Sequence, residues 1–246
     1  DKNPAVFRYL LLFGDGSWDN RFVSNAGNPN YILTYQMDGY PYLSAGTPVT
    51  DDFFGCLGAD ETADSGFLDI GVGRIPASDT SQAGIAVDKI IHYDSPATMG
   101  SWRNQICFVA DDKEDDAFTF LLDADETAKE AQKKIPELNV TKIYLDAYKQ
   151  YISSSGQTCP DAAMSLKNAV SSGMIMLNFT GHGGPDGISS ENIFSRDVVN
   201  TWNNKDRLFL MFTGSCKVTR FDYLSKLQSG NYAPYLTAGE YALFKE

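Results

Sequence analysis

The sequence predicts an α/β fold built on a mostly parallel sheet that is covered on both faces. The first observation is the alternation, after residue 100, of short apolar runs with segments of helical periodicity, the pattern of strand–helix units. The second is the composition: 43% of the 246 residues are hydrophobic and 21% are charged, an ordinary globular balance. Strands that alternate with helices in this way indicate a mostly parallel sheet, because the connecting helices pack on both of its faces.

The first part of the chain is predicted to consist of short strands and loops. Tyr9–Phe13 is an apolar run stopped by a Gly-Asp-Gly turn, which indicates a buried strand. Tyr31–Gln36 and Leu68–Gly71 are shorter strand candidates. From Thr80 onward, apolar residues recur at helical spacing behind a threonine cap. This apolar stripe consists of Ala83, Ala86, Val87, Ile90 and Ile91.

Ser95–Gly100 interrupts the helical pattern and is the predicted boundary between two subdomains, residues 1–98 and 99–246. Strands and helices then alternate regularly, and Pro160 suits the first position of a helix. The predicted strands are Gln105–Ala110, Thr141–Leu145, Met174–Phe179 and Leu208–Thr213. The predicted helices span about 118–134, begin at Pro160, span 196–203 and end the chain at 240–246. The residues expected to face inward are Phe118, Leu121, Leu122, Ala128 and Ile135 in the first helix, and Ala163, Leu166, Ala169 and Val170 in the second.

Charge and hydropathy exclude several classes of function. A formal net charge of -12 disfavours binding of nucleic acid or anionic lipid through bulk electrostatics. No apolar run approaches the roughly 18 residues of a membrane helix. The start at Asp1–Pro4 carries no leader, so we expect any signal peptide to belong to a longer parent chain. The four cysteines form no CxxC pair, which gives no basis for a zinc cluster.

Three loops are predicted to meet at one edge of the sheet. In open α/β sheets, ligands bind beyond the carboxyl ends of the strands. Asp111 and Asp112 follow the first predicted strand of this sheet, Gly181–Gly184 follows the third, and Gly214–Cys216 follows the fourth. An acid, an imidazole and a thiol are therefore expected at the same edge.

Cys216 is the candidate nucleophile, because a side chain just past an apolar strand is accessible to substrate. The alternative is a small buried cysteine, which is how we interpret Cys107 inside its strand. Cys56 and Cys159 lie in loops, and the sequence leaves open whether they are free or paired.

His182 is the candidate acid–base group. Glycines on both sides of it permit unusual backbone conformations and close approach of a substrate. The N–H groups of Gly183 and Cys216 are candidates for an oxyanion hole. The alternative is a histidine that merely caps a loop, and His92, at a helix end, is expected to be structural.

Asp112 is the best-placed third group to orient the imidazole, with Asp111 as the second choice. The alternative is a solvated acidic run, because both residues belong to Asp111–Asp116. This run also offers oxygen ligands for a calcium ion, although its spacing matches no known loop motif. Gly14–Ser17 lacks the lysine and the glycine pattern of a phosphate loop, so nucleotide binding is not expected.

At these positions the chain resembles the gingipain-type (C25) cysteine peptidases. The segment 177–184 (LNFTGHGG) resembles the histidine motif of the family, and 213–216 (TGSC) resembles its cysteine motif. Arg220–Asp222 points to the PorU-like signal-peptidase branch. Three upstream segments, 50–55, 70–76 and 89–93, follow the family's order, and 106–112 resembles the strand whose end carries the third catalytic acid, here Asp112.

The resemblance implies a caspase-like three-layer α/β fold with Cys216 and His182 as a dyad and Asp112 assisting. Residues 1–98 would then be an incomplete N-terminal gingipain-like subdomain, and 99–246 a truncated catalytic subdomain. The PorU-like branch implies a sortase of the type IX secretion system at the outer face of the outer membrane. Its expected partners are cargo proteins with C-terminal sorting domains, an outer-membrane β-barrel shuttle protein and anionic lipopolysaccharide, with no cofactor required.

Two alternatives remain open at this stage: a secreted gingipain-like endopeptidase, and a non-catalytic scaffold of the same fold. No residue clearly corresponds to the acidic specificity pocket of Arg-cleaving gingipains. Asp123, Asp125 and Glu126 lie nearby, but their helical spacing suits a solvated face. We therefore expect a preference for small residues at the cleavage site rather than for Arg or Lys.

Overall fold

The structure is a computed structural model, and it describes residues 7–19, 21, 30–37, 48–63, 67–113, 119–154, 156–191, 193–226, 228–229 and 232–245. Contacts between residues group the chain into two compact units. One comprises residues 1–84 and 220–236, and the other comprises 85–219 and 237–246. The subdomain boundary at 98/99 stays a prediction.

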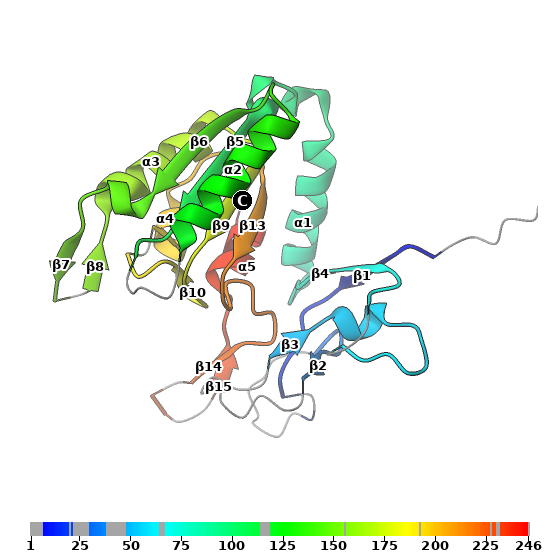
Figure 1. The fold of residues 1–246 in the computed structure, drawn as a ribbon. Coiled ribbons are helices and arrows are strands. Elements are labelled where there is room, and N and C mark those ends of the chain that lie inside the picture. Colours follow the sequence, from blue (N-terminus) through cyan, green and yellow to red (C-terminus); the bar gives the residue numbers. More distant parts are fainter. Residues whose placement is uncertain are drawn as a thin grey trace, which may run out of the picture. The chain divides into compact units, whose positions relative to one another are not determined.

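The larger unit contains a four-stranded parallel sheet, which confirms the predicted fold class (Figure 1). Its strands are β5 (Gln105–Ala110), β6 (Asn139–Tyr144), β9 (Met176–Thr180) and β13 (Leu210–Gly214). The order across the sheet is β13-β9-β5-β6, and all three pairings are parallel. β5 has the predicted bounds, and the other three strands lie within two residues of theirs.

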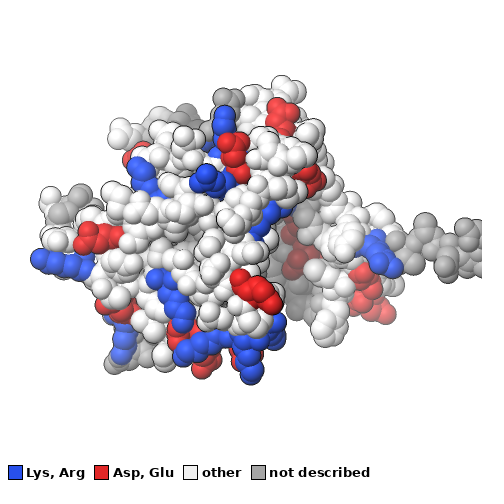
Figure 2. Space-filling view, turned by 90° about the horizontal axis from the view of Figure 1, so that it is seen from above, with Lys and Arg blue, Asp and Glu red and all other residues white. Residues whose placement is uncertain are grey.

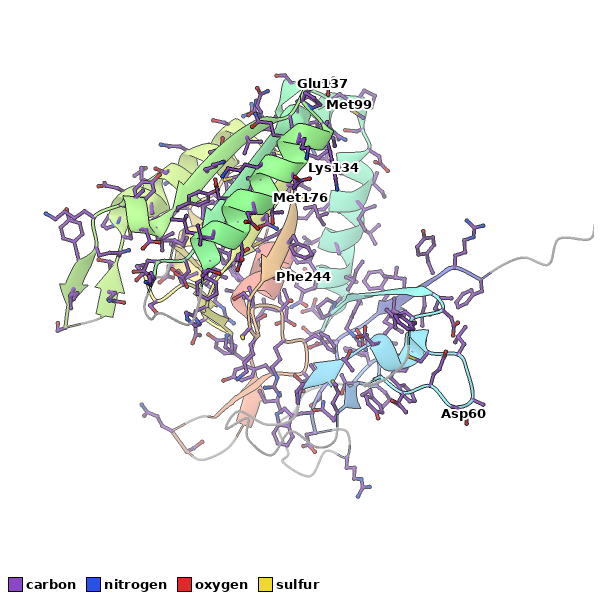
Figure 3. The ribbon with its side chains drawn as sticks, viewed as in Figure 1. Asp60, Met99, Lys134, Glu137, Met176 and Phe244 are labelled. Atoms are coloured by element: carbon purple, nitrogen blue, oxygen red, sulfur yellow. The ribbon has the colours of Figure 1, made fainter. Side chains whose placement is uncertain are left out.

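Helices cover both faces of this sheet. On one face lies α2 (Phe120–Lys134), over Ile106, Phe108 and Met176; Met176 is labelled in Figure 3. On the other face lie α3 (Pro160–Ser172), α4 (Arg196–Asn200) and α5 (Ala238–Phe244), which bury a core that includes Leu166, Leu177 and Phe179. α3 begins at Pro160 as predicted, and α5 begins with a capping box between Thr237 and Glu240.

The predicted inward face of α2 is partly wrong. Leu122 and Ile135 are 58% and 51% exposed, and Phe118 lies outside the described residues. The buried residues of the helix are Ala124 and Ala128, which share a face at i and i+4. Leu122 lies about 200° around the helix from the buried Ala124, so it points away from the sheet. In α3 the inward face is confirmed: Leu166 and Val170 are buried, and Ala163 and Ala169 pack on the same core.

The helix predicted from Thr80 is α1 (Thr80–Tyr93), but its cap is Asp79, whose carboxylate accepts the N–H of Gln82 at 2.8 Å. Its apolar stripe does not form a buried face, because Val87, Ile90 and Ile91 are 40%, 55% and 65% exposed. Polar contacts hold the second half of the helix instead. Lys89 Nζ donates to the carbonyl of Leu243 at 2.8 Å, and His92 Nε2 lies 2.8 Å from Asp206 Oδ1.

Several short strands were not predicted, because runs of two or three residues carry no periodicity. In the larger unit, β10 (Gly183–Gly184), β11 (Gly187–Ile188) and β12 (Phe194–Ser195) form a small antiparallel sheet, and β7 (Tyr151–Ser153) pairs with β8 (Gly156–Thr158). Single turns of 3₁₀ helix occur at Asp52–Gly55, Pro96–Thr98, Ser101–Asn104 and Leu145–Ala147.

Three strand pairs occur among the described residues of the smaller unit. β1 (Tyr9–Phe13), at the predicted position, runs parallel to β4 (Gly71–Ile75). The strand predicted at Leu68–Gly71 is wrong, because pairing with β1 begins at Gly71 and Leu68 is 48% exposed. The other pairs are β2 (Tyr35–Gln36) with β3 (Val49–Thr50), and β14 (Leu224–Lys226) with β15 (Tyr232–Pro234). Of the predicted strand Tyr31–Gln36, only the last two residues are in a strand.

Arg74 organises the smaller unit through all of its guanidinium nitrogens. Nε and Nη2 donate to the two carboxylate oxygens of Asp51 at 2.8 and 2.7 Å. Nη1 donates to the carbonyls of Gly14 and Ile32, and Nη2 also donates to the carbonyl of Leu33. The guanidinium lies 4.6 Å from the ring centroid of Phe221. Three segments of the family resemblance, 50–55, 70–76 and 220–222, thus meet in a structural cluster. Next to Phe221, the carboxylate of Asp222 accepts from Arg220 Nε at 2.7 Å and from Gln36 Nε2 at 2.9 Å.

None of the helices among the described residues combines the length and the hydropathy of a membrane-spanning segment. The face shown in Figure 2 carries basic and acidic side chains interspersed with one another.

Candidate active site

Cys216 lies two residues beyond the end of β13 and is exposed. The next residue, Lys217, has a φ of 58°, in the left-handed region that non-glycine residues rarely adopt. Among the described residues, the other non-glycine residue with positive φ is Ser189, whose N–H donates to the carbonyl of His182 at 3.0 Å. Both unusual backbone conformations therefore flank the candidate dyad, and such conformations cluster at functional sites.

The other cysteines differ from Cys216 in exposure. All four thiols are free, which answers the question that the sequence left open for Cys56 and Cys159. Cys107 and Cys159 are 1% exposed, and burial raises the pKa of Cys107 to about 12. Cys107 is a core residue, as predicted. Cys216 is thus the exposed thiol of the four.

The main chain and the ring of His182 are held by three different elements. Its N–H donates to Asp111 Oδ2 at 2.9 Å, at the end of β5. Its carbonyl accepts the N–H of Ser189, after β11. Its imidazole lies edge-on to Phe120, the first residue of α2, with ring centroids 5.2 Å apart and an interplanar angle of 86°.

Gly183 brings the histidine loop against the cysteine loop. A Cβ atom at Gly183 would lie 2.2 Å from Ser215 Oγ and 3.1 Å from the carbonyl oxygen of Cys216. Gly183 lies opposite Ile188 in β11. In the neighbouring pair, the N–H of Ser189 donates to the carbonyl of His182. Because hydrogen-bonded and non-hydrogen-bonded pairs alternate along an antiparallel ladder, the pair of Gly183 and Ile188 is of the non-hydrogen-bonded type. The N–H of Gly183 therefore points away from β11.

We expect Gly183→Ala to lower kcat/KM by about 100-fold, since displacement of a reacting group by about 1 Å has effects of that size. The added methyl group would overlap Ser215 Oγ and crowd the carbonyl of Cys216. Steady-state kinetics with a peptide substrate measure the loss. Gly184→Ala is the matched control, because nothing lies within 4 Å of its added Cβ. Equal rates for the two variants would contradict the close approach of the two loops.

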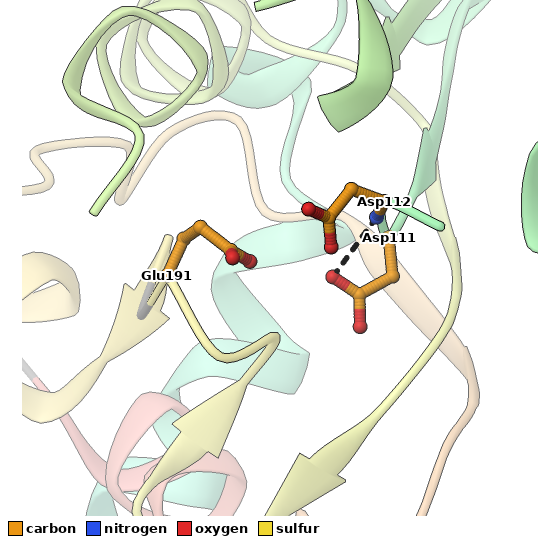
Figure 4. A group of neighbouring side chains, drawn as sticks. All are labelled: Asp111, Asp112 and Glu191. Atoms are coloured by element: carbon orange, nitrogen blue, oxygen red, sulfur yellow. Dashed lines mark hydrogen bonds between the residues drawn. The ribbon is translucent and has the colours of Figure 1, made fainter. Parts of the chain in front are cut away.

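Three carboxylates gather beside the histidine loop (Figure 4). Asp111 and Glu191 are 1% and 3% exposed, and one oxygen of each of the three, Asp112 included, lies within 4.8 Å of the others. Asp111 Oδ1 accepts the N–H of Asp112 at 3.2 Å, and Asp112 Oδ2 accepts from Gln150 at 3.4 Å. Such oxygen groups suit a hard cation like calcium, whose binding stays a prediction. Glu191 was missed by the sequence, because nothing in its local pattern indicates that it folds back onto β5.

The carboxyl group of Asp111 is strongly perturbed. Burial raises its pKa from 3.8 to about 7, and the charges of Glu191 and Asp112 add to the rise, while the N–H donors of His182 and Asp112 oppose it. A cavity of about 250 Å³ adjoins the carboxyl group of Asp111. It is lined by Asp111, Asp112, Lys113, Thr119, Phe120, Leu121, Leu122 and Asp146.

This pKa predicts an unusual dependence of stability on pH. Because the pKa of Asp111 is higher in the folded chain (about 7) than in the unfolded chain (3.8), the folded chain binds the proton more tightly. The free energy of unfolding should therefore fall as pH rises from about 4 to about 7, by an amount on the order of a few kcal/mol, and level off above it. Urea unfolding at a series of pH values measures this.

The comparison for that experiment is Asp111→Asn, which removes the titration and should lose less stability than the natural chain over the same pH range. Asp79→Asn is the control, because Asp79 also accepts a backbone N–H but is exposed. Parallel curves for the natural chain and Asp111→Asn would show that Asp111 does not titrate in this range.

Of the acidic cluster on α2, Asp125 is engaged in ion pairs. Its carboxylate lies 2.6 Å from Lys129 and 2.5 Å from Lys142, and these bonds hold its pKa well below the usual range. The side chain of Asp123 accepts from the Thr119 hydroxyl at 3.3 Å, at the start of the helix. These contacts agree with the interpretation of the cluster as a solvated helix face.

The structure thus brings together the loops that carry Cys216, His182, Gly183 and the two aspartates. The chemical roles of Cys216, His182 and Asp112, and the oxyanion hole, stay predictions. Asp111, the second choice for the acid that orients the imidazole, accepts a hydrogen bond from the main-chain N–H of His182, a contact that the sequence did not indicate.

Solved structures of other proteins share this architecture. The chain resembles the crystal structure of the Arg-specific cysteine proteinase gingipain R (RgpB), with a TM-score of 0.66 and 16% identity over 97% of this chain and 45% of that one. A complex of the Porphyromonas gingivalis RgpB pro- and mature domains matches with a TM-score of 0.62 and 15% identity, over 97% and 46%. A structure described only as a protease matches with a TM-score of 0.63 and 15% identity, over 96% of this chain and 42% of that one. The chain therefore spans less than half the length of these solved chains.

These likenesses show that the chain has the caspase-like α/β fold of the gingipains. No curated protein sequence matches it. The sequence profile of peptidase family C25 matches residues 1–241, nearly the whole chain. On this match, with the fold and the converging loops described above, the chain belongs to peptidase family C25.

Proposed function

We propose that this chain is the catalytic region of a cysteine peptidase in which Cys216 is the nucleophile and His182 the acid–base group. The observation that carries the proposal is the position of the exposed Cys216 beyond β13, against the glycine-flanked loop of His182. Membership of family C25 supports it. A scaffold without activity would need neither an exposed thiol nor this close approach of the two loops.

The reaction follows from these positions. The Cys216 thiolate attacks the carbonyl carbon of the scissile peptide, and the oxyanion is stabilised by the N–H groups of Gly183 and Cys216. The C–N bond then breaks, and His182 donates a proton to the departing amine. The resulting thioester is attacked by water or by a second amine, which releases the product and restores the thiol. Asp112 is proposed to assist the imidazole.

The finer proposal is that the second nucleophile is an amine on anionic lipopolysaccharide, as in a PorU-like sortase of the type IX secretion system. The enzyme would remove the C-terminal sorting domain of cargo at the bacterial cell surface, together with an outer-membrane β-barrel shuttle protein. The support is the Arg220–Asp222 segment after the cysteine motif. Its side chains lie in the structural cluster around Arg74, so it marks the branch of the family rather than the chemistry.

Mass spectrometry of surface cargo from cells that carry Cys216→Ala tests this proposal. We expect cargo to accumulate with its C-terminal domain attached and without lipopolysaccharide. If cargo matures normally while the variant protein is present at its usual level, the sortase proposal is wrong.

A secreted endopeptidase is the second candidate, favoured by the structural likeness to gingipain R. The same cells distinguish it. An endopeptidase would cleave generic peptides in the culture medium, and this cleavage would be lost in Cys216→Ala while cargo maturation continued.

A further inference from the structure

We propose that Asp111 is the positioning residue for His182: its buried carboxylate holds the main chain of the histidine loop so that the imidazole faces Cys216. The inference rests on the function proposed above. It assigns to Asp111 a role that does not involve contact with the substrate.

The first argument is that Asp111 is itself rigidly placed. It directly follows β5, and its N–H donates to the carbonyl of Thr180 in β9 at 3.0 Å, which extends the parallel pairing by one residue. Its side chain packs on Gly181, where an added Cβ would lie only 2.4 Å from the Cβ of Asp111. The close approach therefore requires glycine before the histidine.

The second argument is that one carboxylate joins two loops. Oδ2 accepts the N–H of His182 at 2.9 Å, and Oδ1 accepts the N–H of Asp112 at 3.2 Å. A carboxylate accepts on both oxygens, whereas an asparagine offers one acceptor and one donor, so it can satisfy only one of these two N–H groups. Both loops that carry candidate catalytic groups thus depend on the two acceptor oxygens of this side chain.

The third argument concerns the remaining contacts of His182. Ser189 holds its carbonyl and Phe120 lies against its ring. A packing contact with one edge of an aromatic ring leaves the loop free to slide along that ring, whereas a hydrogen bond to the main-chain N–H does not. Asp111 and Ser189 therefore both hold the main chain of His182, and the bond to Asp111 is the one that ties the histidine to the end of β5.

The fourth argument is the unfavourable energetics of this arrangement. Removal of a carboxylate from water is costly, and Glu191 and Asp112 place two further negative groups beside this one. An apolar residue would avoid this penalty but would leave the N–H groups of His182 and Asp112 without this acceptor. A carboxyl group that is buried at a cost to folding in the centre of a candidate site is expected to serve the reaction.

The test compares Asp111→Asn and Asp111→Ala with the natural protein. We expect kcat to fall by about 10- to 100-fold in Asp111→Asn and further in Asp111→Ala, with KM changed by less than about threefold, because substrate contacts are retained. Asp79→Asn is the control, since it also removes a carboxylate that accepts a backbone N–H. Full kcat in both Asp111 variants would overturn the proposal.

A spectroscopic readout separates positioning from general loss of structure. The chain contains 2 histidines, so a ¹H–¹³C spectrum of the imidazoles shows one signal for His182 and one for His92. We expect the His182 signal to shift and broaden in the Asp111 variants, while the His92 signal, from the pair with Asp206, stays in place. If both signals collapse to unfolded positions even in the isosteric Asp111→Asn, Asp111 is a stability residue and the proposal is wrong.

The variant His182→Ala distinguishes a failure of the proposed peptidase function from a failure of the positioning role of Asp111. If His182→Ala retains turnover, the proposed function itself fails. If His182→Ala is inactive while both Asp111 variants are fully active, the function stands and the positioning role is overturned.

Discussion

We expect iodoacetamide to inactivate the enzyme through alkylation of Cys216, and Cys216→Ala to lower kcat/KM by at least about 10⁴-fold, because no other group can form the thioester. Cys107 and Cys159 are too buried to react, and partial loss of hydration, with the nearby charge of Glu61, raises the pKa of Cys56. Since Cys216 is exposed, the variant should unfold within about 0.5 kcal/mol of the natural chain. Peptide mapping after alkylation, with kinetics and urea unfolding, measures these effects.

The two histidines supply the control for that experiment. His182→Ala should lose activity nearly as completely as Cys216→Ala, because the two groups act as a unit. His92→Ala should remain active, since His92 pairs with Asp206. Alkylation of Cys56 that abolished activity while Cys216 stayed unmodified would show that the nucleophile is wrongly assigned.

Arg74→Met should destabilise the smaller unit by about 3–5 kcal/mol, the usual effect of removing one partner from a buried ion pair. The side chains of Arg74 and Asp51 are only 3% and 13% exposed. The substitution leaves Asp51 without its cation and leaves the carbonyls of Gly14 and Leu33 without this donor. Arg74→Lys should restore little, because an ammonium group cannot bind both carboxylate oxygens and the carbonyls together. Hydrogen exchange resolves the smaller unit from the rest of the chain.

Arg8→Lys is the matched control for Arg74, since Arg8 is an exposed arginine in the same unit. A second check is the double variant Arg74→Met with Asp51→Leu, which removes both charges and should be less destabilised than Arg74→Met alone. If Arg74→Lys unfolds at the same urea concentration as the natural chain, the guanidinium is not what holds the three segments together.

Local patterns explain which elements were predicted well. β5 has the predicted bounds because five of its six residues, Ile106–Ala110, form an uninterrupted apolar run behind Gln105, and α3 begins at Pro160 because proline has no N–H to lose at that position. α1 was predicted as a helix, but its stripe of Val87, Ile90 and Ile91 is exposed. Periodicity indicates that a face exists and does not say what packs against it.

The candidate site likewise has features that the sequence predicts and features that it does not. Strand order places the loops after β5, β9 and β13 at one edge, so the proximity of the aspartates, His182 and Cys216 follows from topology. Which of two adjacent aspartates faces which group does not follow, because neighbouring side chains leave a strand end in different directions. The structure assigns the His182 main chain to Asp111 and brings Glu191 to the same place.

The sequence by itself determined the α/β class, the central parallel sheet and the edge at which the reactive groups meet, since these depend on periodicity and on the rules of strand connection. The tertiary structure decided the partners of buried polar groups, namely Asp111 with His182 and Arg74 with Asp51. Those pairs join residues 71 and 23 positions apart. Their geometry depends on how distant segments pack, and no local pattern records it.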